Sequence, residues 1–229
     1  MFTRPADLPD RVLADELRRG WGLDAASAEY LAVGFGSHHS VALYPFVCGA
    51  RHRYGEALAA SDRRSVLELL VAVHATPDPI RAGALVDDFG VPRRAELLHA
   101  LDRPWSRWDT GPYGEPARLL LASRAAHVVR LLDQHGRLAT RARACPERMV
   151  LTHGEPHPGN LIEADDGWRL VDWDTALIAP PERDLWMIEP GDGSIVGAYE
   201  KATGRPVVAS VLELYRLSLE AGGHFDLRC

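Results

Sequence analysis

The feature that most constrains this 229-residue chain is the stretch LTHGEPHPGN, followed about a dozen residues later by LVDWDT. An apolar, β-branched run, Met149–Thr152, leads into it like a short buried strand. The next residues contain two Gly and two Pro, which excludes a helix. Two short stretches, Leu161–Glu163 and Trp168–Val171, then flank an Asp-Asp-Gly turn ending at Gly167. This spacing predicts a β-hairpin whose second strand ends on Asp172.

Three oxygen-bearing side chains are expected to meet at the end of this small sheet. Glu155 precedes Asn160 by five residues, and the hairpin returns Asp172 to the loop. Carboxylate and carboxamide oxygens suit Mg²⁺, which binds one or two carboxylates together with substrate phosphates. Glu155 could then accept a proton from a substrate hydroxyl. A base, a metal-binding Asn and a metal-binding Asp after a hairpin is the order found in kinase catalytic loops.

The stretch LTHGEPHPGNLI…LVDWDTA closely resembles the H-G-D-x-H-x-x-N and I-D-W motifs of the aminoglycoside phosphotransferase family. These protein-kinase-like enzymes move the γ-phosphoryl group of ATP to a hydroxyl of a small molecule. The resemblance is most specific from Met149 to Met187. It implies an α+β, protein-kinase-like fold, with ATP and Mg²⁺ as cofactors. A reduced β N-lobe with the hinge is expected at residues 1–48, and a mainly helical C-lobe with the catalytic-loop hairpin at residues 49–229.

The resemblance also assigns roles to single residues. Glu155 stands at the catalytic base, where the family has Asp, and Asn160 and Asp172 stand at the Mg²⁺ ligands. Asp184, in PPERDLW, matches the Asp that helps to hold the loop. The other residues expected to support the loop are His153, His157 and Asp174. The residues expected to bind the nucleotide are Gly34, Gly36, Ser37, Phe46 and Val47.

The N-terminal part contains a Gly-x-Gly sequence between two predicted strands, Ala28–Val33 and Val41–Cys48. Such a loop lets backbone N–H groups approach phosphate oxygens, and a plain flexible turn is the alternative. The resemblance implies further strands here, with a Lys for the α- and β-phosphates and a helix carrying its Glu partner. The only Lys of the chain is Lys201. We therefore expect a shortened N-lobe, and a C-terminal side that lacks helices present in other members.

Hydrophobic periodicity predicts helices over much of the remaining chain. Their expected ranges are Leu8–Trp21, Ser61–Thr76, Val91–Leu101, Ala117–Arg143, Ile195–Ala202 and Val208–Leu219. Ser61 or Asp62 is expected to cap the second helix, and Pro92 to lie in the first turn of the third. The resemblance implies that the longest of these helices, Ala117–Arg143, supports the catalytic loop. Its residues expected to face inward are Leu120, Val128, Leu131 and Leu132.

Composition excludes several kinds of partner and location. The net charge of −6 argues against nucleic acid as the main partner. The sequence has no apolar signal segment at its start and no run of about 20 apolar residues, so no membrane association is expected. Its three cysteines are far apart and match no disulfide framework or metal motif, which favours a reducing cytoplasm.

The predicted function is therefore ATP-dependent phosphoryl transfer to a small-molecule hydroxyl, such as that of an aminoglycoside-type antibiotic, a sugar or an amino alcohol, with a role in antibiotic resistance. The sequence does not identify the acceptor or the oligomeric state. Two alternatives are a degenerate phosphotransferase-like protein that binds without turnover and a metal-dependent hydrolase. A zinc site at His153 and His157 is a further alternative, but Gly154 and Pro156 exclude the helix on which that spacing binds zinc.

Overall fold

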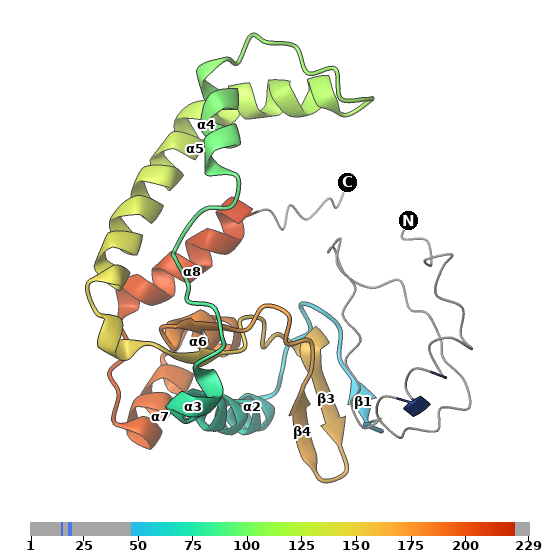
Figure 1. Cartoon of the computed structure of the whole chain (residues 1–229), viewed down its shortest axis with the longest axis vertical. Helices are drawn as coiled ribbons and strands as arrows, with labels where there is room; N and C mark the ends of the chain where they lie inside the picture. Colours follow the sequence, from blue (N-terminus) through green and yellow to red (C-terminus); the bar gives the residue numbers. More distant parts are fainter. Residues whose placement is uncertain (1–14, 16–17, 20–46, 223–229) are drawn as a thin grey trace. The chain divides into compact units, whose positions relative to one another are not determined.

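The computed structural model describes residue 15, residues 18–19 and residues 47–222 (Figure 1). The chain divides into two compact units, Met1–Phe46 and Val47–Cys229, and nearly all of the described residues belong to the second. The predicted Gly-rich loop, the N-terminal strands up to residue 46 and the shortened N-lobe lie outside the described residues. The helix predicted from Leu8 to Trp21 does so too, apart from residues 15, 18 and 19, which are helical.

Helices and short strands make up the second unit, which has the α+β architecture that was predicted. The helices are α2 (Ala60–His74), α3 (Asp78–Arg81), α4 (Arg94–Asp102), α5 (Gly114–Arg143), α6 (Glu182–Ile188), α7 (Ser194–Thr203) and α8 (Ala209–Gly222). The strands are β1 (Ala50–Arg51), β2 (Val150–Thr152), β3 (Leu161–Ala164), β4 (Gly167–Leu170) and β5 (Leu177–Ala179). None of the helices in the described segments combines the length and apolar character needed to cross a membrane.

α2 lies at the centre of the packing around the hairpin. Its apolar residues recur at helical spacing, and the side chains that it buries are Val66, Leu67, Leu70 and His74. The helix begins at Ala60, and its N-cap residue Ala59 has no side chain able to cap it, so the predicted cap at Ser61 or Asp62 is wrong. α2 packs against β2, β4, α6 and α7.

α4 begins three residues later than the predicted start at Val91. Arg93 has a φ of 56°, a left-handed conformation that an α-helix cannot include, so the helix starts at Arg94. Pro92 therefore lies before the helix and not in its first turn, and that prediction is wrong.

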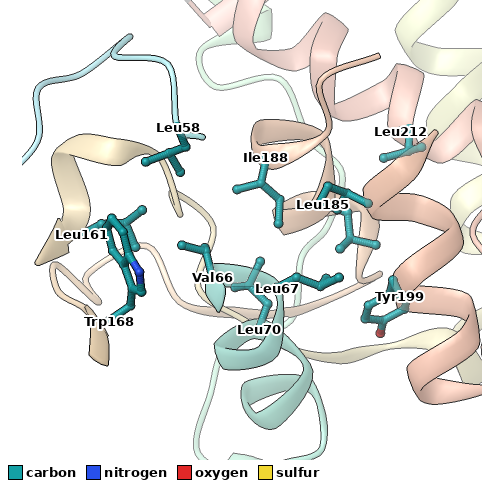
Figure 2. Close-up of a cluster of buried hydrophobic side chains, with 11 residues drawn as sticks. Leu58, Val66, Leu67, Leu70, Leu161, Trp168, Leu185, Ile188, Tyr199 and Leu212 are labelled. Carbon is teal, nitrogen blue, oxygen red and sulfur yellow. The ribbon is translucent and has the colours of Figure 1, made fainter. Parts of the chain in front are cut away.

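One hydrophobic cluster joins α2 to the hairpin and to the three helices that follow it (Figure 2). Its fully or nearly fully buried members include Val66 and Leu70 from α2, Leu161 from β3, Leu185 from α6 and Tyr199 from α7. Burying an aliphatic side chain of this size contributes about 1.5–3 kcal/mol. This cluster therefore fixes the base of the hairpin on α2.

The prediction that the longest helix supports this region is wrong. α5 packs against α8 and α4, through a second cluster that includes Leu138 and Ala142 from its C-terminal half. Leu120, predicted to face inward, is 52% exposed because the N-terminal half of α5 has little packed against it. Periodicity showed an apolar stripe but not which element would cover it.

Two small antiparallel sheets carry the loops of interest. β2 pairs with β5 so that Thr152 faces Leu177, and β3 lies between β1 and β4. The predicted β3–β4 hairpin is present, but its turn has two residues and not three, because Gly167 pairs with Ala164 and begins β4. β4 ends at Leu170 and not on Asp172 as expected.

Candidate active site

The loop after β2, residues 153–160 (the site loop), begins with a backbone held by a buried carboxylate. Asp184 lies in the first turn of α6 and is fully buried. Its Oδ2 accepts a hydrogen bond from the His153 N–H at 2.9 Å, and its Oδ1 accepts one from the Gly154 N–H at 2.6 Å. Gly154 has a φ of 99°, which glycine adopts without strain. Asp184 thus fixes the direction in which the site loop leaves the sheet.

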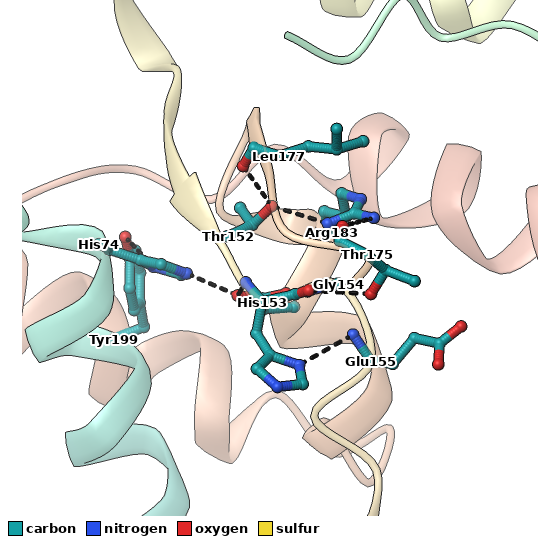
Figure 3. Close-up of polar contacts among 10 residues, drawn as sticks. His74, Thr152, His153, Gly154, Glu155, Thr175, Leu177, Arg183 and Tyr199 are labelled. Carbon is teal, nitrogen blue, oxygen red and sulfur yellow. Dashed lines mark hydrogen bonds and ion pairs between the residues drawn. The ribbon is translucent and has the colours of Figure 1, made fainter. Parts of the chain in front are cut away.

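Asp184 is held in turn by side chains from α2 and α7. His74 Nε2 lies 3.0 Å from Asp184 Oδ2, and His74 Nδ1 lies 3.0 Å from the Tyr199 hydroxyl (Figure 3). Burial by itself raises the pKa of Asp184, but hydrogen bonds from His74, Gly154 and His153 hold that pKa below its ordinary value. Burial raises the pKa of Tyr199 to about 12, so its hydroxyl stays protonated and can donate to His74. With His74 Nδ1 accepting from the Tyr199 hydroxyl, the proton on His74 Nε2 can be donated to Asp184 Oδ2.

His153 joins the site loop to the segment after the hairpin, residues 171–176 (the return segment). Its ring is buried, its Nε2 lies 3.0 Å from the Val171 carbonyl, and its Nδ1 accepts a hydrogen bond from the Glu155 N–H at 3.3 Å (Figure 3). The ring also packs edge-on against Trp173, with 4.6 Å between centroids. Burial lowers the pKa of His153, so the neutral ring, with its proton on Nε2, is the form that donates to Val171.

Asn160 closes the site loop from its other end. Its Nδ2 donates to the backbone carbonyl of Glu155 at 3.0 Å, and its own carbonyl accepts a hydrogen bond from the Val171 N–H at 3.0 Å. This leaves Oδ1 as the Asn160 atom able to bind a cation. The backbone of Glu155 is thus held at both its N–H and its carbonyl, whereas its carboxylate projects away from these contacts and its side chain is 42% exposed (Figure 3).

Asp172 brings a second carboxylate to the same place. It has a φ of 67°, a left-handed conformation that Asp tolerates better than most residues. Partial burial of its carboxyl group, the charge and hydrogen bond of Asp174 and the charge of Glu155 together raise the pKa of Asp172. Three carboxylates that interact in this way form a negative site, and a bound cation would relieve their repulsion.

His157 contacts the site loop and a nearby cavity. Its Nε2 lies 3.9 Å from Glu155 Oε2, and its ring packs edge-on against Tyr54, with 4.8 Å between centroids. Burial lowers the pKa of His157. A cavity of about 270 Å³ is lined by His157 and Pro158 together with residues 54–58, 63 and 186–190. His157 is therefore in reach both of Glu155 and of any small molecule in this cavity.

The structure brings most of the predicted site residues to one place. The four that converge are Glu155, Asn160, Asp172 and Asp174, and the three that surround their backbone are His153, His157 and Asp184. Val47 is half-buried at the start of the second unit, three residues before β1, which pairs with β3. The predicted nucleotide-binding residues that lie outside the described residues are Gly34, Gly36, Ser37 and Phe46.

Metal binding by protein groups alone is not supported in the described part of the chain. No group of three or more His, Cys, Asp or Glu residues there is placed to hold a metal ion. His153 is occupied by the Val171 carbonyl and the Glu155 N–H, so the zinc alternative has no support among these residues. Mg²⁺ differs, since it needs only one or two carboxylates when phosphates supply its other ligands.

Three residues that hold the site loop were missed by sequence reasoning. They are His74, Thr175, whose Oγ1 donates to the His153 carbonyl at 3.1 Å, and Arg183, which bonds to Thr152 and Thr175. The only available signal for His74 was its place on the apolar stripe of α2, four residues after Leu70. For Arg183 it was its place directly before Asp184.

Comparison with known proteins confirms the resemblance inferred from the motifs. A family model described as the phosphotransferase enzyme family matches residues 15–213. Protein StrN of Streptomyces griseus is 30% identical over an alignment of 158 positions, and the match covers 64% of this chain and 49% of that protein. The chain thus spans about half the length of this curated relative.

Two solved structures of spectinomycin phosphotransferase share the fold. The complex with ADP and spectinomycin superposes with a TM-score of 0.62 at 20% identity, over 78% of this chain and 57% of that one. The AMP-bound complex gives a TM-score of 0.61 at 20% identity, over 78% of this chain and 60% of that one. These likenesses show that the second unit has the kinase-like α+β fold that was predicted.

Proposed function

Because the chain belongs to the phosphotransferase enzyme family, we propose that it transfers the γ-phosphoryl group of ATP to a hydroxyl of a small molecule. The acceptor class that we propose is an aminoglycoside-type antibiotic, a sugar or an amino alcohol, and the location is the cytoplasm. ADP and AMP in the related spectinomycin phosphotransferase structures support the choice of an adenine nucleotide.

The observation that carries this proposal is the convergence of one amide and three carboxylates on two short segments. Asn160 binds the backbone of Glu155, and the segment after the hairpin, held to the site loop through Val171, carries Asp172. Glu155 and Asp174 both raise the pKa of Asp172, which reflects the closeness of the three carboxylates. A base beside a cation site suits phosphoryl transfer, which needs mainly positioning and charge neutralisation.

The residues present fit a magnesium ion bound together with phosphates. Asp172 and the Oδ1 of Asn160 would hold it, and Asp174 adds negative charge nearby. When bound, Mg²⁺ supplies positive charge that neutralises the phosphate oxygens. Asn160 is already oriented for this, because its Nδ2 is occupied by the Glu155 carbonyl.

In the proposed reaction Glu155 is the general base. Its exposed carboxylate orients the acceptor hydroxyl and takes its proton, while the oxygen forms a bond to the γ-phosphorus and ADP leaves. His153 holds the Glu155 N–H, and His157 lies beside its carboxylate. We propose that Val47 contributes to the nucleotide site, together with the residues predicted before it. Asp184 keeps the start of the loop in place through the His153 and Gly154 N–H groups.

The test is a calorimetric titration with ATP, with and without Mg²⁺, followed by a phosphate-transfer assay over antibiotics, sugars and amino alcohols. We expect binding that requires Mg²⁺ and is lost in Asp172→Ala. The matched control is Asp166→Ala, which removes an exposed carboxylate from the hairpin turn. ATP binding without transfer to any acceptor would favour the non-catalytic binding protein. Release of inorganic phosphate without a phosphorylated product would favour the hydrolase.

A further inference from the structure

Arg183 is a charged residue that connects the end of β2, directly before the site loop, to the return segment. Its Nη1 donates to Thr152 Oγ1 at 2.9 Å, and its Nη2 donates to the Thr175 carbonyl at 2.7 Å (Figure 3). The Thr152 hydroxyl in turn donates a hydrogen bond to the Leu177 carbonyl of β5 at 2.9 Å. One guanidinium group therefore ties the end of β2 to the chain that follows Asp172 and Asp174.

The same guanidinium lies directly against Gly154. A Cβ built on Gly154 would overlap the guanidinium, at 2.6 Å from Arg183 Cζ. The positive φ of Gly154 turns this bare face of the backbone towards Arg183. The absence of a side chain at position 154 thus allows Arg183 to pass beneath the site loop and reach Thr175.

Arg183 and Asp184 make opposite kinds of hydrogen bond. Asp184 accepts from the backbone N–H groups of His153 and Gly154, whereas Arg183 donates to a hydroxyl and a carbonyl. Asp184 binds the site loop, whereas Arg183 binds the end of β2 directly before that loop and the return segment. Two consecutive residues at the start of α6 therefore hold both segments that carry the proposed base and metal ligands.

We infer that Arg183 is a positioning residue, which sets the spacing between Glu155 on the site loop and Asp172 on the return segment. This inference rests on the proposed function. Arg183 bonds to neither Glu155 nor Asp172, so it acts through the backbone. A displacement of about 1 Å in a reacting group can lower a rate by about 10²-fold. Loss of Arg183 should therefore reduce turnover more than it reduces substrate binding.

The kinetic test compares Arg183→Ala, Arg183→Lys and the control Arg169→Ala, which removes an arginine of the hairpin whose Nη2 pairs with Asp166 at 2.6 Å. We expect kcat to fall by about 10–10²-fold in Arg183→Ala, with KM for ATP within about threefold of wild type. Lys should restore part of kcat, because one ammonium group cannot make both diverging bonds. Added guanidinium ion at millimolar concentration should raise kcat of Arg183→Ala and not of Arg169→Ala. An unchanged kcat, or a change confined to KM, would overturn the inference.

A second measurement does not depend on activity. Hydrogen exchange followed by mass spectrometry should show faster exchange in peptides covering 153–157 and 172–177 of Arg183→Ala, with α7 unchanged. Arg183→Lys serves if the Ala variant does not fold. If the wild-type protein has no phosphotransferase activity but Arg183→Ala still exchanges faster in these peptides, the positioning contact stands and the proposed function fails. Equal exchange in both segments would refute the inference even in an active enzyme.

Discussion

Replacing Asp184 by Asn should destabilise the protein strongly, although it changes a single atom. Asp184 is fully buried, and its two oxygens accept hydrogen bonds from His153, Gly154 and His74. Asn offers only one oxygen, and its NH₂ group must face a donor. The variant therefore keeps the shape of the side chain and removes both the charge and at least one acceptor.

The size of the effect follows from these contacts. Hydrogen bonds to a charged group contribute about 1.5–3 kcal/mol each. Asn loses at least one of these bonds, because its NH₂ group must face a buried donor, so we expect a loss of at least about 1.5–3 kcal/mol. For a chain of this size each kcal/mol lowers Tm by about 2–4 °C, which gives a fall of at least roughly 3–12 °C.

The assay is thermal unfolding by circular dichroism, with Asp166→Asn as the control. Asp166 pairs with Arg169 on the surface, where its side chain is 75% exposed, and such pairs contribute about 0–1 kcal/mol. A Tm for Asp184→Asn within 2 °C or so of the control would refute the reasoning, since it would mean that the buried carboxylate is not needed to hold the loop.

The dependence on pH gives a sharper form of the same test. The folded pKa of Asp184 lies below its unfolded value, so its contribution is complete above the unfolded pKa and is lost as pH falls through the folded pKa. The difference in stability between wild type and Asp184→Asn should be constant from pH 8 to about 5 and should narrow below about pH 4. A difference that widens in acid would contradict the assigned charge state.

The remaining predictions concern the site loop. Glu155→Ala should lower kcat by about 10²–10⁴-fold in the phosphate-transfer assay, and Glu155→Asp should lower it less; full activity in the Ala variant would discard the base assignment. Asp172→Asn should abolish Mg²⁺-dependent nucleotide binding. In the absence of metal it should raise Tm at pH 7, because the raised pKa of Asp172 means that its ionised carboxylate destabilises the fold. This gain in Tm should vanish below about pH 4, where the carboxyl group is protonated in the folded and the unfolded state. Gly154→Ala should lower Tm, since its Cβ would overlap Arg183. Gly136→Ala, which has open space around it inside α5, should stabilise the fold by about 1 kcal/mol. Equal effects of the two substitutions on Tm would contradict the close contact at Gly154.

The sequence was most informative about structure that is set locally. The Gly and Pro residues of the site loop and the Asp-Asp-Gly sequence between two short strand-like stretches were sufficient to predict the β3–β4 hairpin. These features depend on residues close in sequence. The structure also places Asp174 near Asp172, where its charge and hydrogen bond raise the pKa of Asp172.

The sequence was least informative about contacts between distant elements. His74 meets Asp184 across 110 residues of chain, and nothing local distinguishes it from an ordinary core histidine. The family resemblance implied that α5 would support the loop, whereas α2 buries its stripe there and α5 packs on α8. Periodicity identifies an apolar face but not its partner, and the αL conformation of Arg93 could not be read from its residue type.

The structure shows what changes when Glu occupies position 155, where the family has Asp. The longer side chain extends the carboxylate by about 1.5 Å. The backbone of residue 155 is held at its N–H by His153 and at its carbonyl by Asn160, so the loop cannot shift easily to absorb this length. The difference therefore falls on the side chain, whose carboxylate lies 3.9 Å from His157 Nε2 and remains exposed. A shorter Asp on the same fixed backbone would withdraw from that position, and for this reason we expect Glu155→Asp to lower turnover instead of restoring it.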